Sequence, residues 1–152
     1  MKSMTAILFL FMSAGTYGQI EELRRLFSLA SVDQKANQQL LDKTKNAELK
    51  SNTLLYAYHG AALMTMANHY TWPTTKLDYF NRGKKKLEKA INYDLLNVEM
   101  RFIRYSVQKE APAMLGYYED IETDKAFIKK NIKKSGWTKA YQAEVLAFID
   151  KE

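Results

Sequence analysis

The segment NVEMRFIRYSVQK, residues 97–109, decides the fold. When it is wound at about 100° per residue, apolar side chains cover most of the circumference of the helix. A helix that is apolar on several sides needs neighbours on several sides. Its end charges also suit a helix, because the macrodipole favours Glu99 in the first turn and Lys109 in the last. We therefore predict an all-helical domain built around a central helix near residues 97–109.

The composition of the whole chain supports this prediction. The 152 residues include only six glycines and two prolines, and 47% are hydrophobic. Such a chain offers few hairpin signals and enough apolar surface for one packed domain. It has no cysteine, so disulfides, thiol catalysis and zinc–thiolate sites are excluded. We expect neither a metal nor a cofactor.

Residues 1–18 have the pattern of a secretory signal peptide. Lys2 supplies a positive charge, residues 6–12 are an apolar run, and Thr16 and Gly18 fit the small residues before a signal-peptidase site. Cleavage there would leave a mature domain of residues 19–152 with no membrane span. A membrane anchor is the alternative, but the run is shorter than the ~20 residues that span a bilayer. We expect a Gram-negative bacterial protein exported to the periplasm or outside.

The mature chain divides into six or seven helices with short links, which favour antiparallel packing. The residues expected to cap these helices are Ser31 (a capping box with Gln34), Thr53, Thr75, Asn97 and Thr138. The first helix is expected from Ile20 to Ala30, and the sixth over residues 121–134, with Gly136 following it.

Three further expectations concern packing. The small residues 60–62 would let another helix approach closely. Trp72 is expected to pack over a loop at residues 70–75, and Met114 and Leu115 are expected to fill the core after Pro112 ends the central helix.

Part of the chain resembles a tetratricopeptide repeat. The likeness rests on Gly83, Leu87, Ala90, Ile91, the turn at Asp94 and Leu95, and residues 97–105, preceded by Tyr56, Gly60 and Leu63. The third helix with its loop is longer than the ~34-residue period of that repeat allows. The resemblance implies antiparallel helix pairs packed as in those repeats.

The mature chain as a whole is similar to a group of exported all-helical bacterial proteins of no known function. The segments that carry this similarity are residues 58–62, 76–80, 99–104 and 115–117. The similarity implies the fold and the export, and it brings no catalytic residue with it.

The polar strip of the central helix contains Arg101, Arg104 and Gln108. One interpretation is a groove for a carboxylate or phosphate, since arginine forks fit both. The other is that these side chains pair with Glu99, Asp94 or Glu110 and fix the helix junction.

Aromatic residues could line a pocket beside this strip, or they could be core. They are Tyr56, Tyr58, Tyr70, Trp72, Tyr79 and Phe80. The two histidines, His59 and His69, lack the spacing of a helical metal pair.

Lysines gather within residues 84–89 and 125–134. Phe127, between two of them, is expected to face inward, so no aromatics interleave with the lysines at the surface and we predict no nucleic-acid binding. These faces are either solvated or in contact with an anionic envelope surface.

No catalytic constellation can be assembled, so we expect no enzyme. The preferred function is a protein- or peptide-interaction module of the cell envelope. The alternative is a binder of a small anionic or amphiphilic ligand, with Arg101, Arg104 and Gln108 orienting its head, and Tyr56 and Tyr79 beside its apolar part. A concave groove would favour a partner, and a closed apolar pocket would favour a ligand.

Overall fold

The computed structural model describes residues 6–151, with side chains from residue 17 onward. Within them the chain is all-helical, as predicted, and no strand occurs. The α-helices are α1 (Ala6–Ala30), α2 (Gln34–Thr44), α3 (Thr53–Met66), α4 (Pro73–Tyr93), α5 (Val98–Glu110), α6 (Ile121–Asn131) and α7 (Lys139–Ile149). Three 3-10 turns accompany them: η1 (Ala67–His69), η2 (Ala113–Leu115) and η3 (Ile132–Lys134).

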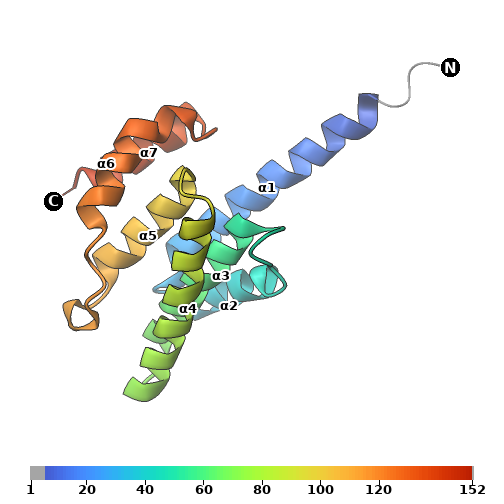
Figure 1. Cartoon of the computed structure of the whole chain (residues 1–152). Helices are drawn as coiled ribbons and strands as arrows, with labels where there is room; N and C mark the ends of the chain where they lie inside the picture. Colours follow the sequence, from blue (N-terminus) through green and yellow to red (C-terminus); the bar gives the residue numbers. More distant parts are fainter. Residues whose placement is uncertain (1–5, 152) are drawn as a thin grey trace.

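The first helix is longer than the sequence predicts. It was expected from Ile20, but α1 begins at Ala6 and runs through position 18 without a break. Its N-terminal part extends beyond the other helices (Figure 1). Lys2 lies outside the described residues, and the signal peptide stays a prediction. No helix among residues 6–151 is both long enough and apolar enough to cross a membrane.

The predicted central helix is confirmed, because α5 is shared by two apolar cores. Met100, Ile103 and Val107 face a core formed with α1–α4. Val98 and Tyr105 face a second core, formed with α6, η3 and α7. In Figure 1 α5 accordingly lies between the α1–α4 bundle and the α6–α7 pair. Phe102 is half-buried and Ile103 is buried.

The helices α3 and α4 approach each other closely, where the sequence predicted a close approach. A Cβ atom added at Gly60 would lie 2.8 Å from the carbonyl oxygen of Gly83. One added at Gly83 would lie 2.3 Å from the oxygen of Gly60 and 2.5 Å from Cγ of Met64. Gly60 also faces Leu87, which follows Gly83, whereas Gly83 faces Met64, which follows Gly60. The two helices therefore run antiparallel.

Several predicted helix ends are confirmed. The side chain of Asn97 accepts a hydrogen bond from the amide of Met100 at 3.1 Å and caps α5. Thr138 caps α7 by accepting from the amide of Tyr141 at 3.2 Å. Gly136 adopts φ 75° after η3, a conformation that glycine reaches without strain.

Other predicted caps are wrong. Asp33, not Ser31, caps α2, and its carboxylate accepts from the amide of Lys35 at 2.9 Å. The fourth helix begins at Pro73 rather than after Thr75, because the fixed φ of proline suits a first helical turn. The Thr53 hydroxyl donates to the carbonyl of Leu49 at 2.7 Å instead of capping α3.

Two packing predictions are also wrong. Trp72 is 75% exposed because it precedes α4 at the surface, so it does not cover a loop. Met114 is 91% exposed, whereas its neighbour Leu115 packs against the first core. The short η2 turn presents only one of these two side chains to the interior.

Candidate functional site

Arg104, from the predicted polar strip, is held by carboxylates. Its guanidinium is buried and donates to both oxygens of Asp124, at 2.7 Å from Nε and 2.8 Å from Nη2. Its Nη1 donates to Glu88 at 2.9 Å and lies 3.3 Å from Asp120. Burial lowers the pKa of Arg104, but the hydrogen bonds and charge of Asp124 outweigh it, and the pKa lies above its ordinary value.

The other two strip residues belong to the same cluster. Arg101 donates to Asp124 at 3.1 Å, and Gln108 donates to Asp120 at 3.3 Å. The carboxylates therefore come from α4, from α6 and from the residue before α6, not from the neighbours that the sequence suggested. An external anion would have to displace Asp124, which is fully buried.

A second buried cluster surrounds Glu99, and sequence reasoning missed it. The Glu99 carboxylate accepts hydrogen bonds from Arg24 Nε at 2.7 Å, from Trp137 Nε1 at 3.0 Å and from the Tyr58 hydroxyl. The Arg24 guanidinium also lies 4.4 Å from the ring centre of Tyr141. The cluster joins α1, α3 and α5 to the start of the C-terminal helix α7.

This cluster is saturated rather than reactive. Both Glu99 oxygens already accept hydrogen bonds, and the residue is only 7% exposed. Burial, together with the charge of Glu99, raises the pKa of Tyr58. Arg24 and Glu99 are 75 positions apart, so no local pattern in the sequence could have paired them.

The two histidines lie apart in different settings. His59 Nδ1 lies 3.1 Å from the Thr44 hydroxyl, and His69 Nε2 lies 2.7 Å from the Ala30 carbonyl oxygen. Burial, followed by the charges of Lys86 and Arg82, lowers the pKa of His59. Among the described residues, no group of three or more potential ligands could hold a metal ion.

The two tyrosines assigned to the site lie on the α3–α4 side of the molecule. Tyr56 is half-buried, with the Lys86 ammonium 4.1 Å from its ring centre. Tyr79 stacks on Tyr70 with ring centres 4.8 Å apart. Within residues 17–151, no hydrogen bond, ion pair or ring contact joins either tyrosine to the Arg104 cluster.

An apolar groove of about 370 Å³ opens where the C-terminal ends of α3 and α5 meet the start of α4. Its apolar lining consists of Met64, Ala67, Pro73, Leu77, Phe80, Val107, Ala111, Pro112, Met114 and Leu115. Its polar lining consists of Thr65, Asn68, Lys76 and Glu110. Leu77 is 48% exposed and Met114 is 91% exposed, so large apolar side chains border solvent here. In the sequence, an indication of this groove was Met114, an apolar residue that lies outside the long helices.

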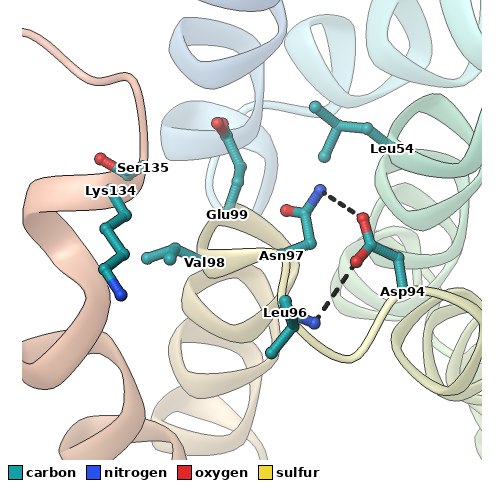
Figure 2. A pocket seen from close by; sticks show the side chains of 8 residues that line it. All are labelled: Leu54, Asp94, Leu96, Asn97, Val98, Glu99, Lys134 and Ser135. Carbon is teal, nitrogen blue, oxygen red and sulfur yellow. Dashed lines mark hydrogen bonds between the residues drawn. The ribbon is translucent and has the colours of Figure 1, made fainter.

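A second hollow, of about 380 Å³, lies at the α4–α5 link and is more polar (Figure 2). Three of its polar side chains are already occupied: Asp94 and Asn97 bond one another, and Glu99 belongs to the buried cluster described above. Asp94 accepts from the Leu96 amide and from the Asn97 side chain, both at 3.3 Å, while Asn97 also caps α5. The apolar groove is therefore the better candidate site.

Comparison with protein-family models, curated proteins and solved structures finds no match to this chain.

Proposed function

We propose that the protein is a non-enzymatic binding module of the cell envelope that holds an apolar segment of a partner protein or peptide in the apolar groove. The observation that carries this proposal is the exposure of Leu77 and Met114 at a concave apolar surface. Exposed apolar residues that gather at a groove are typical of interaction sites. A helical or extended segment can insert alternate apolar side chains into such a groove.

The state of the polar clusters supports binding rather than catalysis. Asp124 and Glu99 are buried, and each accepts hydrogen bonds from several fixed donors. A general base must instead reach a substrate proton within hydrogen-bond distance. These carboxylates serve to join helices, and the groove itself offers mainly apolar contact.

A small amphiphilic ligand is the second candidate. The groove volume falls within the range of about 300–1,000 Å³ that is usual for small-molecule sites. An anionic head could pair with Lys76, which lines the groove, whereas Arg104 is committed to Asp124. Tyr56 and Tyr79 are absent from the groove lining, so an apolar tail would contact Leu77 and Phe80 instead.

The test places a photo-crosslinking residue at position 114 and, as a control, at position 96, which is also exposed but lies at the other hollow. Both versions are irradiated in envelope extract, with and without the substitution Leu77→Glu. We expect a protein crosslink at 114 alone, weakened about 30-fold by Leu77→Glu, the effect of losing an anchor worth about 2 kcal/mol.

Native mass spectrometry of the purified protein separates the two candidates. A bound small molecule that is lost in Leu77→Glu would favour the amphiphile. Equal crosslinking at positions 114 and 96, with no effect of Leu77→Glu and no bound molecule, would refute both uses of the groove.

A further inference from the structure

A face of five lysines runs along α6 and η3, and we call it the α6 lysine face. Its members are Lys125, Lys129, Lys130, Lys133 and Lys134. At about 100° per residue they cover one half of the helix, opposite the buried Asp124, Ile128 and Ile132. Lys125 is half-buried and the other four are exposed. In Figure 1 α6 lies on the far side of α5 from the α1–α3 helices.

Most of the charge on this face is unmatched. Among residues 17–151, Lys129 alone of the five forms an ion pair, with Asp150. Glu122, in the first turn of α6, lies on the same side of the helix at about 100° per residue. Five lysines less these two carboxylates leave a surplus of three positive charges.

Two of the lysines of α4 are arranged differently. The Lys84 ammonium lies 4.7 Å from the ring centre of Tyr117, and the Lys86 ammonium lies 4.1 Å from that of Tyr56. Those two cations contact aromatic rings of their own molecule, whereas four of the five α6 lysines are exposed, Lys134 among them at the border of the hollow near the α4–α5 link. The charge of α6 is therefore available to a partner.

We propose that the α6 lysine face binds the anionic surface of a lipid bilayer. A group of four to eight basic residues on one helix is attracted to anionic headgroups without needing shaped contacts. Over ten residues the face is about 15 Å long, which is enough to meet several headgroups at once. Lysine suits this role because its ammonium acts as a point charge, whereas the guanidinium of arginine is suited to bidentate recognition of a single phosphate.

Two features of α6 argue against other modes of binding. Ile128 of α6 and Ile132 of η3 are buried in the second core, so they are not free to insert into the bilayer. The one aromatic residue of α6, Phe127, lies 5.0 Å from the Arg101 guanidinium and offers no stacking platform for a nucleic acid base. The contact is therefore peripheral and electrostatic, and it does not depend on the groove.

The test measures partitioning of the purified protein onto vesicles. At low salt, the fraction of protein bound is compared between two kinds of vesicle. One contains phosphatidylglycerol and phosphatidylcholine in about a one-to-two ratio, and the other is pure phosphatidylcholine. We expect binding to the anionic vesicles alone, and its loss near 1 M salt, where the Debye length falls to about 3 Å.

A variant with four charges removed tests the location. Each surface lysine contributes roughly fivefold to partitioning, so removing four lowers it by about six hundredfold. The variant changes Lys125, Lys130, Lys133 and Lys134 to Gln, and a second variant changes the same four to Arg. The matched control changes Lys35, Lys45, Lys50 and Lys109 to Gln, which are exposed elsewhere and give the same net charge.

We expect the α6 Gln variant to lose partitioning, while the Arg variant and the control keep most of it. Circular dichroism checks that each variant remains helical. Equal loss in the control would show that only net charge matters and would overturn the proposal. Equal binding to phosphatidylcholine, or to a DNA duplex at the same salt concentration, would also overturn it.

Discussion

The contact between α3 and α4 permits a sharp test through Gly83→Ala. The added methyl group would lie 2.3 Å from the Gly60 oxygen, 2.5 Å from Met64 Cγ and 2.7 Å from the Met64 amide nitrogen. Two of these three atoms belong to the backbone, so a change of side-chain rotamer cannot relieve the overlap. The two helices would have to move apart and loosen the first core.

The expected magnitude follows from two opposing effects. Overpacking a core costs about 1–3 kcal/mol, and contacts with rigid backbone belong at the upper end of that range. Alanine is favoured over glycine inside a helix by about 1 kcal/mol, which offsets part of the cost. We therefore expect Gly83→Ala to lower the free energy of unfolding by about 2 kcal/mol, or the melting temperature by roughly 6 °C.

Urea unfolding followed by circular dichroism measures the effect. The matched control is Asn81→Ala, an exposed position in the same helix, which should raise the free energy of unfolding by a few tenths of a kcal/mol through helix propensity alone. If Gly83→Ala were as stable as the wild type, the close contact between α3 and α4 would not exist as described.

Two further predictions concern titratable groups. Asp124→Asn should lower the free energy of unfolding in urea by about 3 kcal/mol, since it leaves the buried Arg104 without its main partner. The control Asp78→Asn, in an exposed pair, should lower it by at most about 0.5 kcal/mol. Equal losses in the two variants would contradict the buried cluster. Burial and the Lys86 charge lower the pKa of His59 below 6.5, so the unfolded state takes up its proton first as the pH falls. The free energy of unfolding should therefore reach its highest value above about pH 6.5 and decrease as the pH falls below it, and the decrease should be smaller in His59→Gln. An unchanged pH dependence in that variant would contradict the lowered pKa of His59.

Local chemistry made part of the fold predictable. The apolar circumference of residues 97–109 identified the central helix, and Asn97 and Thr138 were recognisable as caps because a cap needs only its own helix. The same local reasoning was wrong at Ser31, because Asp33 two residues later offers a carboxylate to the same helix start. Where two cap residues compete, sequence spacing alone does not decide between them.

The candidate site depended on contacts that the sequence does not encode locally. The polar strip on α5 was recognised, but the partner of Arg104 is 20 positions away on α6, and its position follows from how the second core packs. Met114 was expected inside because it is apolar, yet it lies at the mouth of the groove. An apolar residue in a short turn can face either way, so the groove became visible only in three dimensions.

The sharing of α5 between two cores bears on the order in which the chain can assemble. The first core uses helices α1–α5 with Leu115 and Tyr117, whereas the second core needs the chain through Ile149. In a chain that becomes available from its N-terminus, the first core can therefore form before the second. Until α6 and α7 arrive, the outer side of α5, with Val98 and Tyr105, lacks its cover, and α5 then serves as the template on which they pack.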